Sequence, residues 1–123
     1  MTAARQARIA QLKQFQLIPQ VANNPGVSQR LQAEIDKLLA CDLLILQFPL
    51  WWFSVPAIMK GWIDRVFIAD WAFKFQGGKV VGTMRDIPVH LLGLGGGSHE
   101  GYRKHGYHTA FDTQVATGIF RFC

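Results

Sequence analysis

The spacing of hydrophobic and polar positions changes along the chain, and these changes predict a succession of helices and strands. Residues 3–17 carry a weak apolar stripe at helical spacing, which indicates a short surface helix. The composition of residues 23–26 is that of a turn, and Ser28 starts a second amphipathic helix. The apolar face of this second helix consists of Leu31, Ile35, Leu38 and Leu39. This helix should pack beside a sheet and lead directly into the first strand.

The clearest pattern lies in residues 42–67, which predict a buried strand, an aromatic loop and an amphipathic helix. The continuous apolar run at 43–46 is typical of a parallel strand that is covered on both faces. Pro49 should end this strand, because proline cannot donate to a sheet ladder. Ser54 is a candidate helix cap, and Pro56 stands where a first helical turn tolerates proline. The apolar stripe of the helix is formed by Ile58, Met59, Trp62, Ile63, Val66 and Phe67.

The second half of the chain repeats the order of strand, turn and helix. Residues 70–78 predict an irregular loop, and residues 79–82 predict a short β segment. A second apolar strand spans 88–94 and leads into a glycine-rich turn at 95–98, and a last amphipathic helix is expected over 109–122. Strands that alternate with helices imply an α/β protein with a parallel sheet and right-handed crossovers.

Length and composition fit one small domain. The chain has 123 residues, half of them hydrophobic, and no apolar run approaches the roughly 20 residues that span a membrane. The net charge of +5 comes from basic residues scattered along the chain, which argues against nucleic-acid binding. Cys41 and Cys123 are the only cysteines and suggest no disulfide framework, so a reducing, cytoplasmic compartment is expected.

Two turns follow the two predicted strands and form the candidate binding region, because an α/β sheet binds its ligand outside the carboxyl ends of its strands. The first turn, 50–54, carries three adjacent aromatic side chains, which suit the wall of a flat ring or an ordinary core or dimer contact. The second turn, 93–98, is rich in glycine and lets a ligand approach the backbone closely. It matches neither the G-x-G-x-x-G fingerprint nor a P-loop, so a tight structural turn is the competing interpretation.

Other kinds of chemistry have weaker support in the sequence. His99, His105 and His108 lack the fourth ligand or the helical spacing of a metal site, so no metal is predicted. Ser98 stands beside a histidine but lacks the G-x-S-x-G elbow of a hydrolase. Cys41 stands at a helix end, where a thiolate is not favoured.

The segment QFPLWWFSVPAIMKGWIDRVF, residues 47–67, resembles the hallmark segment of the NAD(P)H:quinone oxidoreductase (DT-diaphorase) family. The similarity continues through residues 68–73 and resumes at Gly93. It implies a three-layer α/β/α flavodoxin-like fold with the parallel strand order 2-1-3-4-5. The two clear strands match the third and fourth of that sheet, and the first and fifth are absent from the sequence. Residues 1–123 are therefore expected to form a single partial flavodoxin-like domain, truncated at both ends.

The resemblance also implies roles for individual residues. The flavin would be lined by Pro49, Leu50, Trp52, Phe53, Gly96, Gly97 and Tyr102. Tyr102 and His108 have the spacing of the family's catalytic pair, in which the tyrosine stabilises charge on the flavin and the histidine is the proton partner. Histidine suits that role because its unperturbed pKa is about 6.5. The substrate would be contacted by Trp52, Phe53 and His108. Leu94 and Gly95 stand where the family often has hydroxyl side chains, so these two positions offer no such hydrogen bond.

The implied function is that of an NAD(P)H dehydrogenase (quinone), an oxidoreductase in which hydride passes from NAD(P)H to a bound flavin and then to a quinone. FAD fits the resemblance better than FMN, and a homodimer is expected. An alternative is an inactive fragment or subunit partner of a flavodoxin-like quinone reductase, unable to hold flavin alone. A flavodoxin-like electron carrier that binds FMN is less favoured, because such carriers are usually acidic and this chain is basic.

Overall fold

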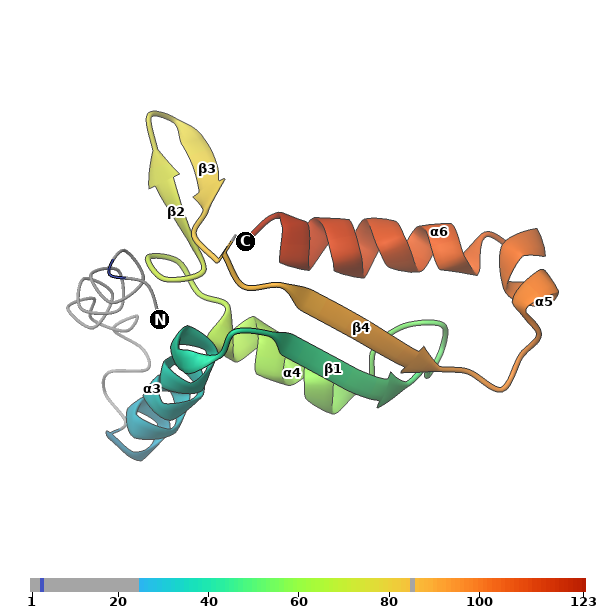
Figure 1. Ribbon diagram of the computed structural model, residues 1–123, viewed down its shortest axis with the longest axis horizontal. Helices are drawn as coiled ribbons and strands as arrows, with labels where there is room; N and C mark the ends of the chain where they lie inside the picture. The colour runs from blue at the N-terminus through green and yellow to red at the C-terminus, as the bar shows by residue number, and fades with distance from the viewer. Residues whose placement is uncertain (1–2, 4–24, 85) are drawn as a thin grey trace.

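The computed structural model describes residue 3 and residues 25–84 and 86–123. The helix predicted over 3–17 falls, from residue 4 on, outside the described residues. The other predicted helices and strands are present, most of them with shifted ends. In chain order the elements are α3 (Pro25–Ala40), β1 (Leu44–Pro49), α4 (Ala57–Val66), β2 (Phe73–Gln76), β3 (Lys79–Gly82), β4 (Val89–Leu94), α5 (His99–Lys104), α6 (Tyr107–Phe111) and the π-helix η1 (Asp112–Arg121), as Figure 1 shows.

The two apolar strands pair in parallel, as the order of elements predicts. β1 and β4 run side by side in register from Leu44 opposite Val89 to Pro49 opposite Leu94. Pro49 is the last residue of β1, so the predicted end of that strand is confirmed. The carboxyl ends of both strands therefore lie at the same edge of the sheet, and each is followed by one of the two candidate turns.

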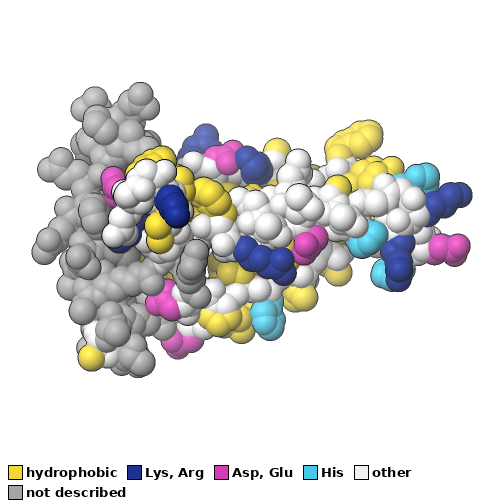
Figure 2. Space-filling model, turned by 90° about the horizontal axis from the view of Figure 1, so that it is seen from above, with side chains coloured by type: hydrophobic (Ala, Val, Ile, Leu, Met, Phe, Trp, Pro, Cys, Tyr) yellow, Lys and Arg dark blue, Asp and Glu magenta, His cyan; other side chains and the backbone are white. Residues whose placement is uncertain are grey.

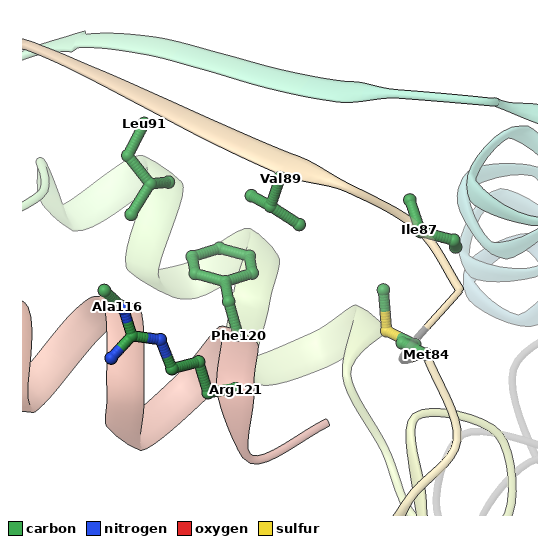
Figure 3. Close-up of a pocket in the computed structure, with 7 residues that line it drawn as sticks. All are labelled: Met84, Ile87, Val89, Leu91, Ala116, Phe120 and Arg121. Carbon is green, nitrogen blue, oxygen red and sulfur yellow. The ribbon is translucent and has the colours of Figure 1, made fainter.

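Within the described chain, helices cover one face of this sheet. Side chains alternate between the two faces of a strand, so Leu44 and Leu46 share a face with their partners Val89 and Leu91. The helices α4 and η1 both lie on that side (Figure 3). The opposite face stays exposed at Ile45 (54%), Leu92 (49%) and Leu94 (60%). The prediction that the first strand is covered on both faces is therefore wrong for the described residues, because their helices reach only one side.

The hydrophobic core lies between α3, α4 and the chain that follows them. Its buried members include Leu31, Ile35, Leu38, Leu39, Ile63, Val66, Phe67, Trp71, Ala72, Met84, Ile87 and Cys123. A polar contact joins α3 and α4, because Trp62 Nε1 donates to Glu34 Oε2 over 3.0 Å.

Two side chains of this region have shifted pKa values. The hydrogen bonds from Lys37 and Trp62 hold the pKa of the Glu34 carboxyl below its usual 4.5. Burial raises the pKa of the Cys123 thiol above its usual 9.0.

The helix α4 does not use the predicted serine cap. Pro56 is the N-cap residue, and no side chain caps the helix. Ser54 exchanges backbone hydrogen bonds with Trp51 instead, over 3.1 and 3.2 Å. The serine thus closes the aromatic turn, and the helix begins after Pro56.

The predicted irregular loop at 70–78 is partly wrong, because residues 73–76 form the strand β2. This strand pairs antiparallel with β3, whose predicted position is confirmed. Gly77 and Gly78, with φ of 59° and 73°, make the two-residue turn between them. Two glycines suit this turn, because both central residues of a type I′ hairpin need positive φ. The hairpin stands away from the parallel sheet (Figure 1).

The chain around Tyr102 is helical. Tyr102 lies in α5 and His108 lies in α6, with Gly106 at φ 72° between the two helices. The predicted helix over 109–122 is present as α6 followed directly by η1, and it begins earlier, at Tyr107. None of the helices in the described part of the chain has the length and apolar character needed to cross a bilayer.

Candidate functional site

The two candidate turns lie side by side at the carboxyl end of the parallel sheet. We call residues 50–54 the aromatic turn and residues 95–98 the glycine turn. The Leu50 N–H donates to the Leu94 carbonyl over 2.8 Å, which continues the β1–β4 ladder into the turns. The Leu50 side chain also packs on the start of the glycine turn, because a Cβ at Gly95 would lie 3.3 Å from Leu50 Cδ1. The arrangement places both turns around one surface.

The aromatic turn holds large side chains in an unusual backbone conformation. Trp52 and Phe53 have φ of 51° and 61°, in the left-handed region that bulky residues rarely adopt. Such a conformation costs about 1–3 kcal/mol per residue and persists where the surroundings enforce it, often at ligand-binding sites. Trp51 and Trp52 are 62% and 93% exposed, so most of their ring surface faces solvent. An exposed aromatic surface on a strained turn is the feature expected of a ligand wall rather than of core.

Tyr102 covers the glycine turn. Its hydroxyl lies 2.8 Å from the position that a Cβ on Gly95 would take, and its Cε2 lies 2.7 Å from the corresponding position on Gly97. The ring reaches this place because Ser98 starts α5 as its N-cap, accepting a hydrogen bond from Gly101 N over 3.1 Å. A side chain at 95 or 97 would therefore displace the tyrosine ring, and Ser98 has a capping role rather than a nucleophilic one.

Four rings, one from the aromatic turn and three from residues 102–107, pack together, and we call them the aromatic cluster: Phe53, Tyr102, His105 and Tyr107. Phe53 meets Tyr102 edge to face with centroids 5.7 Å apart, and it stacks on Tyr107 at 3.7 Å and 11°. Tyr107 also contacts Tyr102 at 5.9 Å and His105 at 5.6 Å. The sequence reasoning missed Tyr107 and His105.

His108 is exposed and has polar neighbours from its own segment. Its Nδ1 lies 3.4 Å from the Tyr102 carbonyl oxygen, and its Nε2 lies 3.1 Å from Thr109 Oγ1. The carbonyl can only accept, so Nδ1 donates to it when that nitrogen carries the proton, and the Thr109 hydroxyl can donate to or accept from Nε2 according to the tautomer. The basic and histidine side chains of this region gather on the surface at the end of the molecule where α5 lies (Figure 2). No group of three metal-binding side chains occurs among the residues that the structure describes.

The predicted site residues thus fall into two groups. The structure brings together Leu50, Phe53, Gly96, Gly97 and Tyr102, with Pro49 at the end of the strand below them. Trp52 faces solvent and makes no ring contact with the aromatic cluster, and the polar contacts of His108 are with Tyr102 and Thr109. The tryptophan and the histidine therefore lie at the rim of the arrangement.

The planar part of a flavin fits these turns. Gly96 has no protein atom within 4 Å of the place that its Cβ would take. Neither the Gly96 nor the Gly97 N–H group makes a backbone hydrogen bond within the described chain, so both can donate to a ring carbonyl. The exposed Trp52 ring on the aromatic turn offers an apolar face to a ligand. The described residues thus suit the ring of a flavin. They include no counterpart of the first strand of a flavodoxin-like sheet or of the phosphate-binding turn that follows that strand.

A separate hollow lies between β4 and η1 (Figure 3). It has a volume of about 470 Å³ and is lined by Met84, Ile87, Val89, Leu91, Ala116, Phe120 and Arg121. Arg121 contributes the one charged group of this lining and donates to Thr117 Oγ1 over 3.3 Å. Apart from Arg121 its walls are side chains of core type, and none of the predicted site residues reaches it.

Comparison with known proteins gives a family and several relatives. The family described as "Flavodoxin-like fold" matches residues 3–123. A Haemophilus influenzae protein named "Uncharacterized NAD(P)H oxidoreductase" is 33% identical over 104 residues, which are 85% of this chain and 52% of the relative. The Rattus norvegicus protein named NAD(P)H dehydrogenase (quinone) 1 is 39% identical over 100 residues, which are 79% of this chain and 36% of the relative. The chain thus spans about half or less of the length of these curated relatives.

A solved structure agrees with the architecture. The structure of "NAD(P)H:quinone oxidoreductase from Methanothermobacter marburgensis" superposes with a TM-score of 0.67, covering 95% of this chain and 53% of that one. Its sequence identity of 22% makes this a likeness of fold alone. The parallel pairing of β1 and β4 and the helix on one side of each strand are consistent with it.

Proposed function

This chain belongs to the family with the flavodoxin-like fold, and on that premise we propose that it reduces quinones with NAD(P)H through a flavin bound at the two turns. The observation that carries the proposal is the meeting of the aromatic turn and the glycine turn, with Tyr102 reaching across from one to the other. The names of the Haemophilus influenzae and Rattus norvegicus relatives support the reaction class.

Each part of the site has a task that follows from its chemistry. Phe53 and Trp52 would exclude water from the faces of the reacting rings, and the glycine-turn N–H groups would orient a ring carbonyl. A flavin bound there would supply the two-electron transfer that no amino-acid side chain provides. The reaction balances when NAD(P)H gives a hydride and the medium gives a proton, leaving NAD(P)⁺ and a hydroquinone.

Tyr102 and His108 are the proposed proton and charge partners. The Tyr102 hydroxyl lies over the glycine turn, where it can donate to developing negative charge. Histidine is suited to proton exchange near neutral pH. In the structure the Nε2 of His108 lies 3.1 Å from the Thr109 hydroxyl, the polar group nearest to the nitrogen that would exchange the proton.

The finer parts of the proposal rest on the resemblance to the DT-diaphorase family and on the cysteines. We propose FAD as the flavin and a homodimer as the assembly, as that resemblance implies. The two free cysteines, Cys41 and Cys123, suit a reducing compartment such as the cytoplasm.

A second candidate function is that of a subunit partner that does not hold flavin alone. The exposed sheet face favours it, because Ile45, Leu92 and Leu94 present apolar surface that a monomer would ordinarily bury. In this case the chain would act by associating with another polypeptide of the same fold.

The function is tested by titrating the purified full chain with FAD and with FMN, following flavin fluorescence, and then measuring NAD(P)H consumption with menadione. We expect saturable binding and a rate that requires flavin, NAD(P)H and menadione together. Phe53→Ala should lower the rate about tenfold or more, because a wall of the site is lost. Val80→Ala is the matched control, since Val80 on β3 is exposed to the same extent (40% against 39% for Phe53) and should keep the rate.

Absence of both flavin binding and menadione reduction would contradict the proposal. Tight association with a longer flavodoxin-like quinone reductase, without flavin binding by the chain alone, would instead support the second candidate.

A further inference from the structure

We propose that Tyr107 is a positioning residue that holds Phe53 in place and so sets the affinity of the site for its quinone. This inference rests on the proposed function, because it assigns Tyr107 a part in that same site. None of the roles implied by the family resemblance falls on Tyr107.

Tyr107 is the centre of the aromatic cluster. It contacts each of the other three rings, Phe53, Tyr102 and His105, whereas His105 contacts Tyr107 alone. Its closest contact is the one with Phe53, at 3.7 Å between centroids and 11° between planes. Removing this ring therefore removes the contact that joins the aromatic turn to α6.

Phe53 needs such a support. Its φ of 61° is in the left-handed region, and the neighbouring Trp52 shares this conformation at 51°. A backbone in this region relaxes unless the surroundings hold it. The backbone bonds between Trp51 and Ser54 fix the ends of the turn but not the direction of the Phe53 ring. Its ring contacts are with Tyr102 and Tyr107, and only the latter lies flat against it.

Tyr107 is itself held firmly. Gly106 before it has φ 72°, which turns the chain from α5 into α6. The Ala110 N–H donates to the Gly106 carbonyl over 2.9 Å, and Phe111 stacks on the buried Phe48 of β1 at 6.0 Å. The short helix that carries Tyr107 is thereby anchored to the sheet, so its ring is a fixed surface for Phe53.

The ring of Tyr107, and not its hydroxyl, performs this task. The structure gives the Tyr107 hydroxyl no hydrogen bond within the described chain, whereas the ring makes three aromatic contacts. Phenylalanine at position 107 should therefore still hold Phe53 in place. Leucine should not, although its side chain is apolar and of moderate size.

The test compares Tyr107→Leu and Tyr107→Phe with the wild-type full chain, supplied with flavin, in steady-state kinetics with menadione. We expect Tyr107→Leu to raise KM for menadione about 3- to 10-fold, which corresponds to the strength of one aromatic pair. Its kcat should stay within about twofold of the wild-type value, because the substitution removes a binding contact and not a group that stabilises charge. Tyr107→Phe should match the wild type in both constants.

A second readout needs no flavin and no activity. Proton NMR of the chain with labelled phenylalanine measures the chemical shifts of the Phe53 ring protons. In the wild type and in Tyr107→Phe, the ring current of residue 107 should move these shifts away from those of free phenylalanine. In Tyr107→Leu the shifts should return toward the free values. Wild-type activity together with an unchanged KM in Tyr107→Leu would overturn the inference, as would unmoved Phe53 signals. An inactive wild-type chain would instead overturn the proposed function and, with it, the effect of Tyr107 on quinone affinity.

Discussion

Replacing Gly82 with alanine should lower the free energy of unfolding by about 3 kcal/mol or more, since the new methyl group cannot be accommodated. A Cβ at this position would lie 2.3 Å from the Cys123 carbonyl oxygen and 2.5 Å from that of Phe122. Both are backbone atoms, so no side-chain rotation relieves the contact. The same Cys123 carbonyl accepts a 2.7 Å hydrogen bond from Met84 N, so moving it away breaks a bond beside the buried core. The effect is measured by urea and thermal unfolding of the two chains.

Gly96→Ala is the matched control for this prediction. It is the same substitution at a position where the added Cβ has no protein atom within 4 Å. Its free energy of unfolding should stay within about 0.5 kcal/mol of the wild-type value. Equal unfolding midpoints for Gly82→Ala and Gly96→Ala would show that Cys123 does not pack against β3 in solution.

The second large expected effect also concerns Gly96→Ala. This substitution should weaken flavin binding about tenfold or more. The space above Gly96 is empty of protein but, in our proposal, is where the flavin ring lies. A methyl group there leaves the protein undisturbed and meets only the ligand, at a cost of the order of 1–3 kcal/mol for a forced contact. Fluorescence titration with FAD measures the change in Kd directly.

Gly61→Ala serves as the control for the flavin titration. Gly61 lies in α4 away from both turns, and its added Cβ would meet only the flexible end of the Arg65 side chain, at 3.0 Å. This variant should bind flavin as the wild type does and should be slightly more stable, because alanine favours a helix interior over glycine. Unaltered FAD affinity in Gly96→Ala would place the ring elsewhere.

The parts of the fold that could be predicted are those with a local signal. The apolar runs before Pro49 and before the glycine turn predict strands, and the alternation of strands and helices predicts their parallel pairing, both of which are confirmed. Parallel pairing then brings the two turns to one edge. The position of the candidate site thus follows from the sequence by topology, without any long-range contact being known.

Two of the predictions that failed depend on competing local contacts. Ser54 has the chemistry of a helix cap, but it bonds with Trp51 and leaves Pro56 at the helix start. The segment 73–76 is too short and too mixed to stand out as a strand, and it becomes one because the Gly77–Gly78 turn folds it onto β3. In each case the residue types were suitable, and pairing with a neighbouring segment decided the outcome.

Tyr107 could not have been assigned from the sequence by the same reasoning. Its contact with Phe53 spans two elements far apart in the chain and depends on the left-handed conformations of Phe53 and Gly106. A tyrosine in a segment rich in glycine and histidine is ordinarily solvent-exposed. Only the packing of α6 against β1, through Phe48 and Phe111, brings its ring to the aromatic turn.

The central claim is that a flavin ring lies between the aromatic turn and the glycine turn, and backbone amide NMR of the full chain titrated with FAD tests it most directly. We predict saturable shifts of the amide signals of residues 50–54 and 95–98 and of Tyr102, with the β2–β3 hairpin unaffected. Shifts confined to the hollow between β4 and η1, around Leu91 and Phe120, or no saturable shift at all, would contradict the claim.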